Sequence, residues 1–172
     1  METNPNAYGI NIEFAHPRAI ELIPENFFWD CVDEMAPFGS DEGDIVLMEY
    51  RDWRKKNPDK RLYEWLKSTI ECIGQMSINA YDNSLLDEDL ILYQIMDWSF
   101  DDHYHVFLLD LSVYATGFGQ LVDEGTIDQE IKPLIQIALS RQKIWAALQK
   151  DWKFRYEYID RMKVLERALK EA

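Results

Sequence analysis

Two histidines beside two aspartates form the only histidine cluster of the chain, at residues 101–105. Imidazole and carboxylate groups are ligands of Zn²⁺ and Ni²⁺. On a β-strand His103 and His105 would share one face, whereas on a helix a spacing of two places them roughly 200° apart, too far to bind one ion. The sequence favours a helix start capped by an aspartate. If a metal binds, its candidate ligands are Asp102, His103 and His105.

A second group of carboxylates lies next to aromatic residues, around residue 30. Such groups can bind a divalent cation or a cationic ligand. The spacing does not fit a calcium-binding EF-hand loop, and a helix capped by Ser40 explains the acidic residues that follow it without a ligand. We treat the earlier part as a candidate ligand cleft, formed by Trp29, Asp30, Asp33 and Glu34.

No arrangement of residues indicates covalent catalysis. Cys31 and Cys72 are 41 residues apart in apolar sequence, which predicts buried, reduced thiols rather than a disulfide or a nucleophile. Gly117 and Gly119 form a Gly-x-Gly without the third glycine of a phosphate-binding loop, so they favour close helix packing. The sequence predicts no cofactor and favours a non-enzymatic protein, although it leaves enzymatic activity open.

The central third of the chain is acidic without compensation. Between Lys67 and Lys132 there are 64 consecutive residues without Lys or Arg, and 13 of them are Asp or Glu. Such a surface attracts cations and repels anions, so we expect a basic protein as partner, and neither nucleic acid nor an anionic membrane. The predicted partner-binding residues are Asp82, Asp87, Glu88, Asp89, Asp97, Asp101, Asp102, Asp123 and Glu124.

Composition indicates a compact globular protein. Of its 172 residues, 47% are hydrophobic and 13% aromatic, which fits one domain and excludes a disordered acidic tail. The net charge of −14 is uneven, because residues 133–172 are net basic while the rest is strongly acidic. We find no secretory leader and no apolar run of about 18 residues, so we expect a cytoplasmic location.

Turn residues divide the chain into helical segments. His16-Pro17 predicts a short helix that ends near Leu22, and residues 25–35 continue with helical spacing. Ser40 is the predicted N-cap of the next helix, which ends in three basic residues.

Further along, Asn57-Pro58 predicts the start of a helix, with asparagine as the cap. Ser84 would begin another helix, with Asp87 in its first turn. Residues 105–121 are apolar nearly all round, which is typical of a central helix. Residues 133–172 would form one long helix with a bend near Lys150-Asp151.

We therefore predict an all-α fold, a single multihelical, bundle-like domain of about seven helices over residues 1–172. Residues 1–14 are expected to be extended or loosely ordered. A small α+β domain with one hairpin is the alternative, because residues 106–114 could form a buried strand and residues 152–158 alternate between apolar and polar.

These features agree best with a non-enzymatic interaction module that binds a basic protein by electrostatic and shape complementarity. In size and charge the chain is similar to the small acidic helical immunity proteins that neutralise basic toxins. That resemblance implies an immunity- or antitoxin-like role, and a regulatory adaptor is equally compatible. The competing hypothesis is a helical protein that binds a metal or a small molecule. Six Trp and nine Tyr leave a homodimer through an exposed aromatic patch open.

Overall fold

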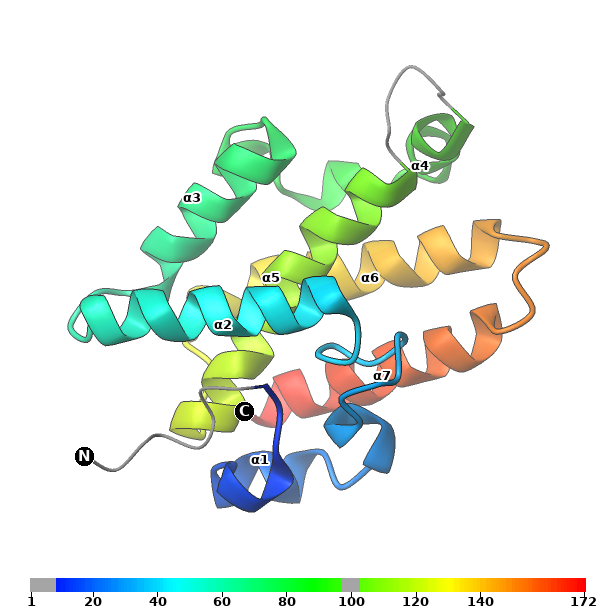
Figure 1. Ribbon diagram of the computed structural model, residues 1–172. Helices are drawn as coiled ribbons and strands as arrows, with labels where there is room; N and C mark the ends of the chain where they lie inside the picture. The colour runs from blue at the N-terminus through cyan, green and yellow to red at the C-terminus, as the bar shows by residue number, and fades with distance from the viewer. Residues whose placement is uncertain (1–8, 97–102) are drawn as a thin grey trace.

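The computed structural model describes residues 9–96 and 103–172, with their side chains except those of residues 103–105. These residues form seven α-helices and four 3-10 helices and contain no β-strand (Figure 1). The α-helices are α1 (Pro17–Leu22), α2 (Asp41–Lys56), α3 (Leu62–Gly74), α4 (Glu88–Met96), α5 (His103–Glu124), α6 (Lys132–Leu148) and α7 (Arg155–Glu171). The 3-10 helices are η2 (Ile12–Phe14), η3 (Asn26–Trp29), η4 (Ile78–Ala80) and η5 (Asn83–Leu86). The predicted all-α, bundle-like fold is confirmed.

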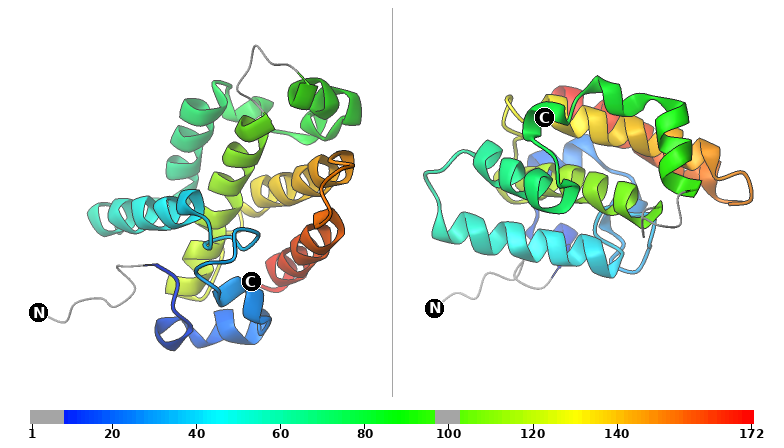
Figure 2. Two further views of the ribbon diagram at one scale, coloured as in Figure 1. Left: turned by 45° about the vertical axis from the view of Figure 1, so that its right-hand side comes forward. Right: turned by 90° about the horizontal axis from the view of Figure 1, so that it is seen from above.

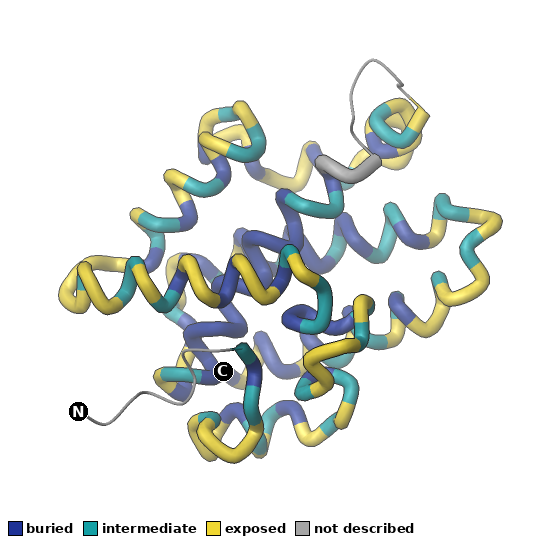
Figure 3. The backbone as a smooth tube through the Cα atoms, viewed as in Figure 1, coloured by how far each residue is buried: buried dark blue, intermediate teal, exposed yellow. Residues whose placement is uncertain are grey.

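Helix α5 lies at the centre, and the other helices pack around it (Figures 1 and 2). Helices α1, α2, α3, α4 and α6 contact α5, and α7 packs against α6. Every residue from Leu109 to Val122 is buried, as the dark stretch in Figure 3 shows. A helix that is apolar on all sides is stable only when it is covered on all sides. The helix predicted here is confirmed, and the strand over residues 106–114 is not formed.

Two predicted helix starts are confirmed by their hydrogen bonds. The side chain of His16 accepts a hydrogen bond from the Arg18 amide (3.2 Å), and α1 ends at Leu22. The Ser40 hydroxyl accepts a hydrogen bond from the Gly43 amide (3.1 Å) at the start of α2. Both caps supply an acceptor to an amide that has no partner within the helix.

The helix predicted over residues 25–35 is wrong. Only η3 forms there, and tight turns follow. The Asp30 and Asp33 carboxylates accept hydrogen bonds from the backbone amides of Val32 and Met35 (3.0 Å each). Such local side-chain bonds offer the backbone an alternative to a helix, and they prevail here because Val32 gains no burial.

The predicted starts of α3 and α4 are displaced. The Asn57 side chain donates to the Trp53 carbonyl (2.9 Å) and so closes the end of α2, while α3 begins only at Leu62. Asp87, predicted inside the first turn of a helix begun by Ser84, is itself the residue that caps α4. It accepts a hydrogen bond from the Leu90 amide (2.8 Å).

The long C-terminal helix is divided more sharply than a bend. Helix α6 ends at Leu148 and α7 begins at Arg155, and the two lie side by side as an antiparallel pair (Figures 1 and 2). The interruption near residues 150–151 is where the bend was predicted, but the prediction of one long helix over residues 133–172 is wrong. The reversal lets both helices bury apolar faces against each other, which a continuous helix could not do.

Three further expectations concern exposure and order. Cys31 and Cys72 were expected to be buried, but both are exposed, because Cys31 lies in a surface turn and Cys72 on the outer face of α3. Of residues 1–14, expected to be extended or loosely ordered, residues 1–8 lie outside the described part. Ile10 is buried and Ile12–Phe14 is helical. Among the described residues, no helix is both long and apolar enough to cross a bilayer.

Candidate functional site

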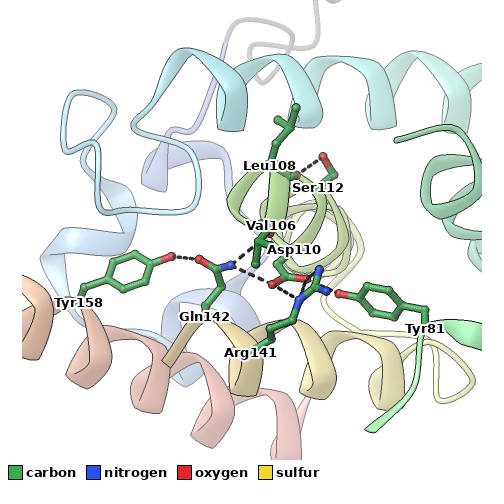
Figure 4. A network of polar contacts seen from close by, with 8 residues as sticks. All are labelled: Tyr81, Val106, Leu108, Asp110, Ser112, Arg141, Gln142 and Tyr158. Carbon is green, nitrogen blue, oxygen red and sulfur yellow. Dashed lines mark hydrogen bonds and ion pairs between the residues drawn. The ribbon is translucent and has the colours of Figure 1, made fainter. Parts of the chain in front are cut away.

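A fully buried polar network joins α5 to α6 (Figure 4). The Asp110 carboxylate accepts hydrogen bonds from the Arg141 Nε (2.8 Å) and Nη2 (2.7 Å), the Gln142 Nε2 (2.8 Å) and the Tyr81 hydroxyl (2.7 Å). The Tyr158 hydroxyl donates in turn to the Gln142 Oε1 (2.9 Å). The residue Tyr81 before η5 and two residues of α6 therefore bind one carboxylate of α5, and α7 joins the network through Gln142.

The electrostatics of this network indicate an ion pair between Asp110 and Arg141, with neutral tyrosines around it. Burial alone would lower the pKa of Arg141, but the adjacent Asp110 carboxylate outweighs burial, and the pKa is raised. Burial raises the pKa of Tyr81 and Tyr158 well above the ordinary value. The second cause is the negative charge of Asp110 for Tyr81, and the neighbouring Tyr114 hydroxyl for Tyr158; both raise the pKa further.

The network has no access to solvent, because the side chains of Asp110 and Arg141 are 0% and 1% exposed. It therefore fastens helices together and offers no place for a ligand. None of the residues predicted from the sequence belongs to this network. The available signal was an aspartate within an almost continuously apolar helix, together with the Arg141-Gln142 pair inside another helix.

Two of the predicted partner-binding carboxylates are engaged within the protein. Asp123 forms an ion pair with Arg51 (2.8 Å), and Glu124 forms one with Arg54 (2.8 Å). The Tyr50 hydroxyl also donates to Glu124 (3.0 Å). These contacts attach α2 to the end of α5, so the two charges are largely compensated.

Four other predicted carboxylates gather at η5 and the start of α4. Asp82, Asp87, Glu88 and Asp89 are exposed, and within the described part of the chain none of them forms an ion pair. The pKa of Asp82 is lowered by hydrogen bonds from the side chain and amide of Ser84. The remaining predicted residues, Asp97, Asp101 and Asp102, lie outside the described residues.

The outer face of α4 is apolar. Ile91 points into the core, whereas Leu92 is 39%, Tyr93 66% and Met96 64% exposed. Leu90 is also exposed. We use the name "α4 surface" for this apolar face together with the four carboxylates, and its members are Asp82, Asp87, Glu88, Asp89, Leu90, Leu92, Tyr93 and Met96.

A groove of about 580 Å³ begins beside the α4 surface. Its lining includes Glu88 of α4, Ile144 and Leu148 of α6, and Ile159 of α7. Because α4, α6 and α7 leave these side chains partly uncovered, the groove extends the apolar area of α4 toward residues 149–156. We use the name "α6–α7 loop" for this segment, which joins the two helices and includes the first two residues of α7.

Ser140 and Lys143 also line this groove, at the Ser-x-x-Lys spacing of some acylating enzymes. Lys143 Nζ, however, is ion-paired with Glu166 (2.7 Å). Ser140 lies in the middle of α6, where the backbone amides are bonded within the helix and cannot stabilise an oxyanion. The pair therefore serves helix packing. The spacing is visible in the sequence but was not among the predicted motifs.

The predicted ligand cleft is a set of turns. The Trp29 indole donates to the Ile23 carbonyl (2.9 Å), Asp30 and Asp33 bind turn amides, and Asp33 also pairs with Arg161 (2.6 Å). Glu34 is exposed. Across the described residues, no three His, Cys, Asp or Glu side chains are grouped to hold a metal ion. The side chains of His103 and His105, and all of Asp102, lie outside that part.

No protein-family model matches the chain, and no solved structure matches it. The chain is similar to a bacterial protein, the uncharacterized protein YfeS of Escherichia coli (strain K12), with 29% identity over 140 residues. The match covers 81% of this chain and 55% of YfeS, so the chain spans about half the length of this curated relative. The name of the relative states no activity.

Proposed function

We propose that this protein is a non-enzymatic interaction module that binds a basic partner protein through the α4 surface. The observation that carries the proposal is the coincidence of an exposed apolar helix face with four carboxylates that have no ion-pair partner among the described residues. An apolar face excludes water from an interface, and unpaired charges at its edge select the sign of the partner.

The placement of the acidic residues supports a basic rather than a neutral partner. Glu88 and Asp89 occupy the first turn of α4, where the free amides of the helix favour carboxylates. That local benefit explains their position, but it does not explain why no lysine or arginine accompanies them. A partner with Lys or Arg around an apolar ridge would complement both parts of the surface.

Two roles fit such a module. As an immunity- or antitoxin-like protein it would cover a functional surface of a basic toxin, and as a regulatory adaptor it would hold a basic protein in a complex. In either role long-range attraction would accelerate the encounter, and the rate would fall with rising salt.

Affinity capture from lysate of the source organism, at about 0.1 M and about 1 M salt, tests the proposal, because charge attraction is screened at the higher salt. Captured proteins would be identified by mass spectrometry, purified and titrated against the module. We expect a basic protein that binds wild type at low salt and is lost with Glu88→Lys/Asp89→Lys. The matched control, Asp41→Lys/Asp44→Lys, changes two exposed first-turn carboxylates of α2 and should bind normally.

Equal loss of binding in both variants would show a general charge effect and contradict the proposal. Recovery of no basic partner, or binding indifferent to salt, would contradict it as well. Circular dichroism of all three proteins establishes that they share one fold.

A further inference from the structure

We infer that this chain forms a two-fold homodimer in which the α4 surface of each copy packs against the α6–α7 loop of the other. The inference goes beyond the proposed function and stands without it, because it depends only on this chain.

The α6–α7 loop carries the opposite character to the α4 surface. Lys150 and Lys153 are exposed, and Phe154 and Tyr156 are 43% and 65% exposed. Lys153 Nζ lies 4.5 Å from the centre of the Phe154 ring, so charge and apolar area are presented together. With Arg155, three cations stand within six residues, together with the exposed carboxylate of Asp151, so residues 150–155 carry a net charge of +2.

The loop is held in a fixed position. Trp152 packs against Tyr158 (ring centres 5.3 Å apart) and Trp145 (5.9 Å), and the Arg155 guanidinium donates to the Lys150 carbonyl. The aromatic cluster below the loop therefore presents its lysines and aromatic rings on a rigid base. Rigid presentation lowers the entropy lost when an interface forms.

The two surfaces lie at the same end of the molecule. Figures 1 and 2 place α4 and the turn between α6 and α7 on the same side of the molecule, with the C-terminal end of α6 between them. The groove lined by Glu88, Leu148 and Ile159 lies among α4, α6 and α7 at this end. Of the eleven large hydrophobic side chains that the described residues expose, six belong to these two segments. Much of the exposed apolar area therefore lies on the acidic α4 surface and on the basic α6–α7 loop.

A two-fold interface requires a surface that complements itself. An acidic, apolar half and a basic, aromatic half on either side of a groove meet this condition when the two-fold axis passes through the groove. Each copy then places Glu88 and Asp89 against Lys150 and Lys153 of the other. No ion pair joins the two halves within one copy, among the described residues, so both remain available.

A second copy covers the same α4 surface that the proposed basic partner would use. The dimer and the complex with a partner are therefore mutually exclusive, and a sufficiently basic partner would have to displace the second copy. Purified protein alone can test the dimer, so its failure leaves the partner experiment unaffected.

Sedimentation velocity of the full chain at about 1 to 100 μM, at low and high salt, tests the inference. We expect wild type to pass from monomer to dimer with concentration, and more weakly at high salt. Glu88→Lys/Asp89→Lys and Lys150→Glu/Lys153→Glu should each weaken the dimer by about 100-fold or more, since like charges then oppose each other.

Mixing these two variants is the decisive step. In the mixed pair both contacts again join opposite charges, so dimers should reappear although neither variant dimerises alone. Asp41→Lys/Asp44→Lys is the control and should dimerise as wild type does. Tyr93→Ser/Met96→Ser, which changes only exposed apolar side chains, should weaken the dimer without altering charge.

A wild-type protein that stays monomeric throughout this range would overturn the inference. So would variants that dimerise normally, or a mixture of the two charge-reversed variants that remains monomeric while both proteins show the wild-type circular dichroism.

Discussion

Replacing Asp110 by asparagine should destabilise the protein severely. The substitution preserves the shape of the side chain but leaves the buried Arg141 without its counter-charge. Asp110 now accepts hydrogen bonds from Tyr81, Arg141 and Gln142, and both of its oxygens are used. An amide offers only one oxygen, so its NH₂ group would face donors from Arg141 and Gln142.

The expected loss in free energy of unfolding is about 3–5 kcal/mol. Removal of one partner from a buried ion pair typically costs this amount, because an uncompensated charge stays in the interior. Two donors left without acceptors cost about 1–3 kcal/mol each, or about 2–6 kcal/mol together, which agrees with this value. Since a domain is stable by only about 5–15 kcal/mol, Asp110→Asn should leave a marginal protein.

Urea unfolding, followed by circular dichroism and tryptophan fluorescence, would measure this loss. The companion variant Arg141→Met leaves a buried carboxylate that can take up a proton. A buried carboxylate without a counter-charge should cost this variant about 3–5 kcal/mol as well. Asp110→Leu/Arg141→Met removes both charges and should cost far less than the two single changes together.

A loss below about 1 kcal/mol for Asp110→Asn would refute the reasoning, because the carboxylate would then not be compensating a buried guanidinium. A double variant as unstable as the sum of the single variants would refute it too, since the two residues would then act independently.

Three further outcomes follow from the structure. The raised pKa of Tyr81, Tyr114 and Tyr158 means that stability is fully present below pH 10 or so and lost above it, by about 1.4 kcal/mol per pH unit for each tyrosine. In Tyr114→Phe, the free energy of unfolding above pH 10 or so should therefore fall less steeply with pH, by about 1.4 kcal/mol per pH unit, as urea unfolding at a series of pH values would measure. Ser40→Ala should cost about 1 kcal/mol, a fall of roughly 2–4 °C in Tm by calorimetry, because the α2 cap is lost. Gly39→Ala should cost about 1–3 kcal/mol in urea unfolding, since a Cβ would lie 2.0 Å from a backbone oxygen and the turn must shift.

The sequence predicted the helical elements where apolar spacing and a cap agreed. Ser40 before an amphipathic segment determines α2 from local physics, and the run of residues apolar on all sides favours the helix α5 over the strand that was its alternative. Prediction failed where side chains compete with the backbone, as at Asp30 and Asp33, whose turn-forming bonds have no periodic signature. It failed again at Asn57, because one residue can close one helix or start the next, and only packing decides between them.

The acidic central third illustrates what sequence cannot resolve about a site. From charge alone, all of its carboxylates look equivalent, yet arginines of α2 and α6, from either side of the span, reach Asp123, Glu124 and Asp110 in three dimensions. The acidic run therefore contains carboxylates that hold helices together through ion pairs, the anchors, and carboxylates at η5 and the start of α4 that form no ion pair within the described part of the chain. Changing an anchor should therefore affect stability first, whereas changing Glu88 or Asp89 should affect binding with little effect on folding. A charge change at Asp123 that abolished binding in a protein of undiminished stability would contradict this division.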